Sequence, residues 1–393
     1  MKSIDRDITP HLLTAAKHFP CTVITGPRRS GKTYLLRHLF PKAEYYLFED
    51  PDIISRFRQD PQGFLDGVKP PVILDEIQNL PEVFNYVRSR IDANPRKMGQ
   101  WFLTGSQEAG LMRNVTESMA GRAAVLQLLP MSLSETPKVS LLHGGHPEVL
   151  ARPKAARLWF SSYLQTYLER DVRAVTAVQD LGTFRRFMSL LAARHGSILN
   201  KTDLAGPLGM SVPGVGKWLD ILETTAQIFV VQPFFENMGK RIIRSPRIYI
   251  ADPGLACHLL GIDTEAELEK SPFLGAIFEG FVAAEIIKAQ VNDGLRRELY
   301  YFRDQQGLEV DFVIPGKNGS MKLIEAKASR TVKPDMAGPM RRLSDAWKKH
   351  FGDRRAVKSI LVHRPARASI SSKAITEDVE VCSWKELANH VID

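Results

Sequence analysis

Near its amino-terminus the chain reads Gly26-Pro27-Arg28-Arg29-Ser30-Gly31-Lys32-Thr33, a complete G-x-x-x-x-G-K-T phosphate-binding loop. The preceding residues 21–25 (CTVIT) are largely β-branched and predict a short strand. Residues 34–40 (YLLRHLF) follow the loop with apolar side chains at helical spacing. Because the motif requires this strand–loop–helix order, the sequence predicts an α/β P-loop fold.

The residue types in the loop suit ATP and Mg²⁺. Two glycines allow the backbone to wrap an anion, so that its N–H groups surround the phosphates. Lys32 is expected to reach the β- and γ-phosphates, and the Thr33 hydroxyl is expected to bind Mg²⁺. We therefore predict that the cofactor-binding residues are Gly26, Pro27, Arg28, Arg29, Ser30, Gly31, Lys32, Thr33 and Tyr34.

A pair of carboxylates follows the next apolar run. Residues 70–78 (PPVILDEIQ) predict a buried strand of a parallel sheet, and the run ends in Asp75 and Glu76. Asp75 is expected to hold Mg²⁺ through its water shell. Glu76 is expected to polarise the water that attacks the γ-phosphate.

Two further segments are candidates for the same site. Residues 101–107 (WFLTGSQ) predict a strand with a polar end, and the carboxyl ends of parallel strands converge on the ligand crevice. Thr104 or Ser106 is therefore placed to sense the γ-phosphate, with a hydroxyl-capped turn as the alternative. Arg122 precedes the predicted strand 123–129, where an arginine could reach a neighbouring subunit's nucleotide or could be an ordinary surface residue.

These motifs and their order resemble the prokaryotic AAA+ family labelled AAA_14, whose members carry a C-terminal region called DUF4143. The resemblance covers nearly the whole chain and also rests on SMAGR (118–122), LLPMS (128–132), GGHPEVL (144–150) and YLQTYLERDV (163–172). It implies an ATPase with an αβα core, a helical lid and a winged helix. Lys32 and Thr33 then belong to the Walker A motif, and Asp75 and Glu76 to the Walker B motif.

The resemblance also implies roles that local patterns do not. Thr104 or Ser106 becomes sensor 1, and Arg122 becomes the arginine finger of a ring, most simply a hexamer. Pro147 is similar to a proline that packs on adenine, although a plain turn explains it equally well. For sensor 2 there are three competing candidates, Arg152, Arg170 and Arg173.

The middle of the chain predicts a winged helix-turn-helix. Its pattern is helix, glycine turn, helix and strand, at residues 184–194, 200–210, 211–223 and 228–234. The candidate DNA-binding cations are Lys217 on the second helix and, on the wing, Lys240, Arg241, Arg244 and Arg247. Such a cluster binds phosphates without reading sequence, and the alternative is a solvated edge strand protected by its charges.

The last region carries a different chemistry. Glu279, Asp311 and the Glu325-x-Lys327 pair resemble a PD-(D/E)XK nuclease-like core, with Glu285 as an alternative to Glu279. In a strand, residues 325 and 327 share one face, so Asp311 and Glu325 could bind Mg²⁺ beside Lys327. Two alternatives remain open: an ordinary ion pair on one sheet face, and a fold that binds DNA or a protein without cleaving.

Together these patterns divide the chain into an ATPase core (1–136), a helical lid (137–180), a winged helix-turn-helix (181–255) and a nuclease-like α/β domain (256–393). Overall composition adds little: the net charge of +9 fits nucleic acid and ordinary basic surfaces alike. Three widely spaced cysteines favour a reducing cytoplasm without disulfides or zinc. No apolar run approaches the ~18 residues of a membrane span.

We therefore expect an ATP-hydrolysing protein that acts on branched or single-stranded DNA as a ring. Two alternatives are an ATP-gated, structure-specific nuclease and a nucleotide-switched regulator whose C-terminal domain binds a protein.

Overall fold

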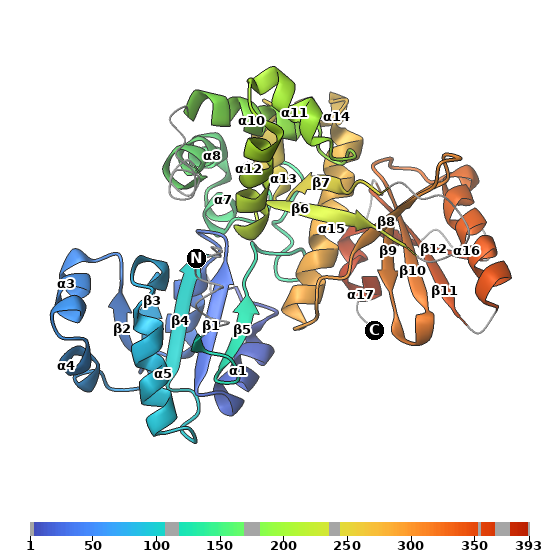
Figure 1. The fold of residues 1–393 in the computed structure, drawn as a ribbon. Coiled ribbons are helices and arrows are strands. Elements are labelled where there is room, and N and C mark those ends of the chain that lie inside the picture. Colours follow the sequence, from blue (N-terminus) through green and yellow to red (C-terminus); the bar gives the residue numbers. More distant parts are fainter. Residues whose placement is uncertain are drawn as a thin grey trace.

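The computed structural model describes residues 4–106, 118–168, 181–235, 244–352, 355–365 and 378–391. Within them, the first domain is built on a parallel five-stranded sheet in the order β2-β3-β4-β1-β5 (Figure 1). Its strands are β1 (Cys21–Gly26), β2 (Glu44–Leu47), β3 (Val72–Asp75), β4 (Trp101–Ser106) and β5 (Ala123–Gln127). Its helices are α1 (Thr9–His18), α2 (Lys32–Leu39), α3 (Pro51–Gln59), α4 (Pro61–Asp66) and α5 (Val83–Ala93), with a 3₁₀ turn at Ile77–Asn79.

Helices cover both faces of this sheet, which makes the predicted αβα sandwich. On one face, Leu12 of α1 and Leu36 of α2 pack on Ile24 of β1 in a single apolar cluster. On the other face, the cluster joins Phe57 of α3 and Phe84 of α5 to strand residues such as Val23, Leu74 and Leu103. Since the inner strands β1, β3 and β4 have an apolar layer on each side, they read as nearly continuous hydrophobic runs.

The middle region is mainly helical and ends in a hairpin. Its helices are α7 (Pro147–Ala151), α8 (Ala156–Tyr163), α10 (Leu181–Ala193), α11 (Lys201–Leu208) and α12 (Val212–Thr224), with a 3₁₀ turn at Pro153–Ala155 and a π-helix at Leu164–Leu168. The antiparallel strands β6 (Ile228–Pro233) and β7 (Arg247–Ile250) follow. Gly209 ends α11 at a φ of 63°, and the Ser211 hydroxyl caps α12. This is the expected element order, and the winged-helix assignment remains a prediction.

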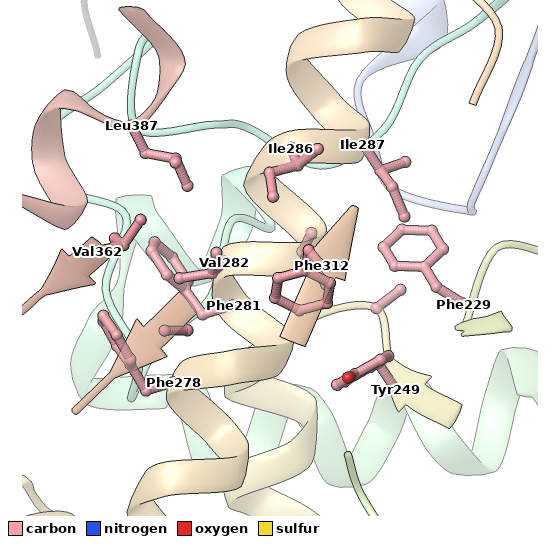
Figure 2. Packing of buried hydrophobic residues seen from close by; sticks show 14 of the residues in the cluster. Phe229, Tyr249, Phe278, Phe281, Val282, Ile286, Ile287, Phe312, Val362 and Leu387 are labelled. Atoms are coloured by element: carbon pink, nitrogen blue, oxygen red, sulfur yellow. The ribbon is translucent and has the colours of Figure 1, made fainter. Parts of the chain in front are cut away.

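The C-terminal region places helices on both faces of a mixed sheet. Its helices are α13 (Pro253–Leu259), α14 (Glu265–Lys270), α15 (Leu274–Asn292), α16 (Gly338–Phe351) and α17 (Ala388–Val391), with 3₁₀ turns at Lys317–Gly319, Pro334–Ala337 and Trp384–Glu386. Its strands are β8 (Tyr300–Arg303), β9 (Glu309–Pro315), β10 (Met321–Lys327), β11 (Val357–His363) and β12 (Val379–Ser383). Figure 2 shows Phe278, Phe281 and Ile286 of α15 packed near Phe312 and Val362 of the sheet.

The predicted boundary at residue 255 does not separate two sheets. The described strands of the middle and C-terminal regions form one seven-stranded sheet in the order β12-β11-β10-β9-β8-β6-β7. Strand β6 pairs with β7 on one side and in parallel with β8 on the other, where Gln232 lies opposite Tyr300. The hairpin that closes the middle region is therefore continuous with the C-terminal sheet.

Helix α15 also reaches back to the ATPase core. Glu285 Oε2 accepts a hydrogen bond from Leu133 N at 2.7 Å, and Lys288 Nζ donates to Met131 O at 2.9 Å. The two side chains also pair with each other at 2.8 Å and are nearly fully buried. Glu285, the sequence-based alternative to Glu279, thus binds the segment after β5 and lies outside the carboxylate group that was expected to include it.

One buried carboxylate joins α13 to the loop before α7. Asp252 caps α13 by accepting from Leu255 N at 3.1 Å, and its other oxygen accepts from Gly145 N at 2.8 Å. We expect Asp252→Ala to lower the free energy of unfolding by about 2–3 kcal/mol, because it leaves two buried N–H groups without partners. The measurement is chemical denaturation. Asp263→Ala is the control, since Asp263 pairs with the exposed Arg157 and should cost less than about 1 kcal/mol; equal losses would contradict the prediction.

Candidate functional site

A cavity of about 630 Å³ lies at the carboxyl edge of the parallel sheet. The phosphate loop, the end of β3 and strand β2 form much of its wall, and Met131 and Pro147 approach from the segment after β5. Several residues named from sequence as ATP ligands therefore line one cavity. Its place outside the carboxyl ends of the strands is where open parallel sheets bind ligands.

The loop conformation explains why glycine occupies its two ends. Gly26 has a φ of 145°, and a Cβ there would lie 2.1 Å from the carbonyl oxygen of Leu128. Gly31 has a φ of 97° and immediately precedes the first turn of α2. The chain can therefore enter α2 with its N–H groups facing the cavity only if both positions lack a side chain.

Three polar side chains in the loop are buried, those of Arg28, Ser30 and Lys32. Lys32 Nζ donates to Gly26 O at 3.1 Å and to Pro27 O at 3.0 Å. Ser30 Oγ is fully buried and has no hydrogen-bond partner among the described residues. A buried hydroxyl without a partner is uncommon, and at this position it fits a loop shaped to receive an anion.

Asp75 is held by hydroxyl groups from three different elements. Thr33 Oγ1 lies 3.0 and 2.8 Å from its two carboxylate oxygens, Tyr45 OH donates to Oδ2 at 2.7 Å, and the Thr104 hydroxyl also donates to Oδ1. Asp75 is 2% exposed. Neutral donors leave its negative charge in place, and the adjacent Thr33 adds a second hard oxygen. These residues fit Mg²⁺, with Thr33 and Asp75 as the groups that would hold it.

Tyr45 was not named from the sequence. Burial and the neighbouring Asp75 carboxylate raise the pKa of its hydroxyl, so the group stays a neutral donor. Arg6 was also missed: it lines the cavity and donates to Ser30 O at 3.0 Å and to Leu129 O at 2.7 Å, which connects the loop to the segment after β5. The alternation of residues in β2 could have pointed to Tyr45, whereas nothing local to Arg6 indicates its contacts.

Glu76 lies beside the cavity in a left-handed backbone conformation, with a φ of 58°. Its Oε2 is 3.6 Å from the guanidinium of Arg28, and it accepts a hydrogen bond from the Gln78 amide. A non-glycine residue at positive φ carries backbone strain, which often accompanies function. The glutamate therefore lies close to the phosphate loop, and its role as the base stays a prediction.

Of the two sensor candidates, Thr104 lies at the site. Its hydroxyl bonds Asp75 and also accepts from Glu76 N at 3.3 Å. Ser106 ends β4, but its side chain falls outside the described residues. Thr104 thus contacts both members of the carboxylate pair.

Arg122 lies at the opposite edge of the sheet. Its carbonyl accepts from Cys21 N, at the start of β1, whereas the phosphate loop follows the end of β1. Its side chain pairs with Asp92 at 2.5 Å and is 31% exposed. Arg122 therefore cannot complete the site of its own subunit, and a role toward a neighbour and an ordinary surface ion pair both remain open.

The adenine and sensor 2 candidates are only partly placed. Pro147 begins α7 and lines the cavity, and the next residue, Glu148, pairs with Arg29 at 3.4 Å. Arg152 is exposed. Arg170 and Arg173 lie outside the described residues, so sensor 2 stays open between the three arginines.

A second group of charged residues lies in the C-terminal region, and we call it the Arg247 cluster. Its members are Arg247, Glu279, Glu309, Asp311, Glu325 and Lys327. All four residues of the nuclease-like prediction belong to it, from α15, β9 and β10. Lys327 Nζ lies 2.5 Å from Glu325 Oε1 and 3.8 Å from Asp311 Oδ2.

Arg247 requires a correction. The sequence predicts an exposed cation that contacts DNA phosphates, but Arg247 is 4% exposed within β7. Its guanidinium lies 2.7 Å from Glu279 Oε1 and 3.8 Å from Asp311 Oδ1, pairs with Glu309 and stacks over the Tyr301 ring. The error arose because four cations in eight residues suggest a solvated surface, whereas the partners of Arg247 lie 32–64 residues further along the chain.

The pKa values of Glu279, Asp311 and Glu325 lie above their usual range. Burial raises the pKa of Glu279 to about 8 and of Glu325 to about 7, and repulsion from Asp311 adds to both shifts. Burial also raises the pKa of Asp311. The cluster contains four carboxyl groups and two basic side chains, so its acidic groups are in excess.

Of the remaining candidates for DNA contact, two are exposed in the structure and two lie outside the described residues. Lys217 on α12 and Arg244 before β7 are exposed. Lys240 and Arg241 lie outside the described residues. In the described part of the chain, no helix is long and apolar enough to cross a membrane.

Comparisons with known proteins agree with the ATP site. One family model, described as an AAA domain, matches residues 18–136. Two models of domains of unknown function follow it along the chain: DUF8612 at residues 135–266 and DUF4143 at residues 274–372.

Relatives from bacteria and archaea share most of the chain. The uncharacterized protein Rv2008c of Mycobacterium tuberculosis is 32% identical over 316 residues, which covers 79% of this chain and 70% of that protein. The uncharacterized protein MJ1544 of Methanocaldococcus jannaschii is 23% identical over 377 residues, covering 84% and 80%.

Among solved structures, the Walker-type ATPase PABY2304 of Pyrococcus abyssi is similar at a TM-score of 0.44 and 16% identity, over 65% of this chain and 96% of that one. The AAA match and the geometry of the phosphate loop make this chain an AAA-type ATPase that binds and hydrolyses ATP. It belongs to the AAA+ family whose members join an AAA domain of the AAA_14 type to a C-terminal DUF4143 region.

Proposed function

We propose that ATP hydrolysis in this protein drives a ring-forming motor that binds or remodels branched or single-stranded DNA. The observation that supports a ring most directly is Arg122, which lies at the sheet edge opposite its own phosphate loop. For DNA, the support is the cationic connection between β6 and β7, which includes Lys240, Arg241 and Arg244. The three buried cysteines, none in a disulfide, support a cytoplasmic location.

The hydrolysis step follows from the side chains at the cavity. Lys32 would exchange its bonds to the loop carbonyls for the β- and γ-phosphates. Thr33 and Asp75 would hold Mg²⁺, which when bound neutralises the phosphate charge. Glu76 would accept a proton from the attacking water, while Thr104 keeps both carboxylate residues in place.

Hydrogen bonds of Met131 connect the ATP site to α15 and to the helical region, which supports the proposal that ATP hydrolysis moves other parts of the molecule. Met131 lines the cavity and its carbonyl accepts from Lys288 of α15. Its N–H donates to Gly145 O at 2.8 Å, close to Pro147. Movement of this segment on nucleotide binding would therefore act on α15 and on the helical region together.

The deciding experiment is the ATPase rate with single-stranded, duplex, forked and four-way DNA, at low and moderate salt. We expect branched or single-stranded DNA to raise the rate and salt to weaken the effect, because phosphate contacts release counterions. A rate that no DNA changes would remove DNA from the proposal and favour a nucleotide-switched regulator that binds a protein.

The first prediction of this mechanism concerns the base. We expect Glu76→Gln to bind ATP normally and to lower kcat at least ~100-fold, because an amide cannot accept the proton. Lys32→Ala should lose turnover through loss of the cation on the phosphates. Nucleotide binding and turnover are measured in parallel. Glu49→Gln is the control, because Glu49 also lies near Arg28, at 3.7 Å, but is more exposed; turnover near wild type in Glu76→Gln would refute the assignment.

The second prediction concerns assembly. Arg122→Ala should bind ATP and fail to hydrolyse it, and mixing it with Lys32→Ala protein should restore part of the activity. Recovery requires an intact pocket and an intact arginine to meet across one interface. Arg88→Ala is the control, because Arg88 pairs with the same Asp92 at 3.7 Å. Mixed oligomers without any recovery, or a fully active monomer, would rule out the role in trans.

The third prediction concerns the basic connection. Replacing Lys240, Arg241 and Arg244 by serine should weaken DNA binding for all sequences alike, and reduce the slope of log K against log salt by roughly 2–3. Arg247 is left in place because it is buried. ATP hydrolysis without DNA should not change. The control variant replaces the exposed Lys42, Arg96 and Lys97 of the ATPase core by serine. Equal DNA affinity of the two triple variants at every salt concentration would contradict the prediction.

A further inference from the structure

The Arg247 cluster brings together two groups of residues that the sequence assigned to different functions. Although the sequence had assigned Arg247 to DNA binding on the wing, the guanidinium of Arg247 faces three carboxylates. These are Glu279 on α15 and Glu309 and Asp311 on β9. The Tyr249 hydroxyl, also on β7, donates to Glu279 Oε1 at 2.5 Å. Strand β7 therefore supplies both the cation and a hydrogen-bond donor to an acidic centre built by the C-terminal region.

The cluster does not fit a divalent metal. Mg²⁺ needs several oxygens in near-octahedral geometry at about 2.1 Å, and a nuclease centre takes them from carboxylates. Within the described ranges, no group of three or more His, Cys, Asp or Glu residues could hold a metal ion. Two carboxylates expected to bind metal, Asp311 and Glu325, instead lie within ion-pair distance of Lys327, and Asp311 is also near Arg247.

The Arg247 guanidinium is also held too firmly to be an incidental neighbour. It stacks over the Tyr301 ring, whose centroid lies 4.9 Å away. The Tyr301 hydroxyl in turn donates to Ser245 O, two residues before Arg247. A planar, delocalised cation suits this combination of carboxylates and an aromatic face better than a hydrated metal ion does.

We propose that Arg247 takes the place of the divalent cation in a nuclease-like acidic centre, so that this centre is a structural lock and not a site of DNA cleavage. This goes beyond the proposed motor, since it assigns the cluster a role that ATP hydrolysis does not require. The lock fixes the β6–β7 hairpin to α15, β9 and β10. The hairpin and the C-terminal sheet then move as one body.

The first test is Mn²⁺ binding by nucleotide-free protein, followed by electron paramagnetic resonance. We expect either no bound Mn²⁺ or a signal that Asp75→Ala abolishes and Asp311→Asn leaves unchanged. Single-stranded and four-way DNA should stay intact in Mn²⁺. Mn²⁺ that is lost in Asp311→Asn and kept in Asp75→Ala, or nicking that Asp311→Asn abolishes, would overturn the proposal.

The second test measures the lock by thermal unfolding. Arg247→Met should lower Tm by roughly 5–10 °C, because it removes the cation that pairs with the buried Asp311 and the partly buried Glu279. Adding Glu279→Gln to that variant should restore part of the loss, which also provides a folded protein if Arg247→Met alone does not fold. Arg303→Met is the matched control, because Arg303 also pairs with Glu309, at 3.3 Å, but is 39% exposed; its Tm should change little. An Arg247→Met protein as stable as Arg303→Met, or a double variant no more stable than Arg247→Met, would refute the lock.

Discussion

The buried pair of Glu285 and Lys288 constrains how the two halves of the molecule meet. Burying two charges costs several kcal/mol per ion, and their mutual attraction offsets this only with further hydrogen bonds. Here those bonds come from the backbone of Leu133 and Met131, in the segment that leaves the parallel sheet. The pair is satisfied only while α15 lies against the ATPase core. The wall of the ATP cavity and the C-terminal region therefore share one fixed contact.

The ATP site and the Arg247 cluster both contain carboxylates, and the neighbouring side chains determine the role of these carboxylates. Asp75 is surrounded by hydroxyl groups, which orient it without removing its charge, so it remains available to a cation. In the Arg247 cluster, Arg247 and Lys327 already pair with the carboxylates and neutralise part of their charge. Carboxylates are thus free to bind a ligand cation at the ATP site, whereas in the Arg247 cluster they form ion pairs that hold the fold together.

Residues of the candidate site could be named from the sequence where they belong to a contiguous motif. The phosphate loop, Asp75, Glu76 and Thr104 were all named from short contiguous stretches. The structure brings the loop, Asp75 and Glu76 to one cavity, and Thr104 contacts it through a hydrogen bond to Asp75. Arg6 and Arg247 were not predictable because their contacts depend on distant residues. Arg6 meets Leu129, 123 positions away, and Arg247 meets Glu309, 62 positions away. The cluster of cations around Arg247 in the sequence predicted that Arg247 is exposed. The carboxylates that pair with it lie far away in sequence and come close only in the folded protein.

The shared strand β6 has a mechanical consequence. A load applied along the hairpin would pass into the C-terminal sheet through the short β6–β8 pairing, where Gln232 and Pro233 face Tyr300 and Tyr301. Proline has no N–H to donate, so this ladder is weak in shear. Strand β7 carries Arg247 and provides a second path of ionic contacts in parallel with it. Force on the hairpin would therefore be divided between two adjacent strands, and β7 would transmit its share to α15 and β9 through side chains.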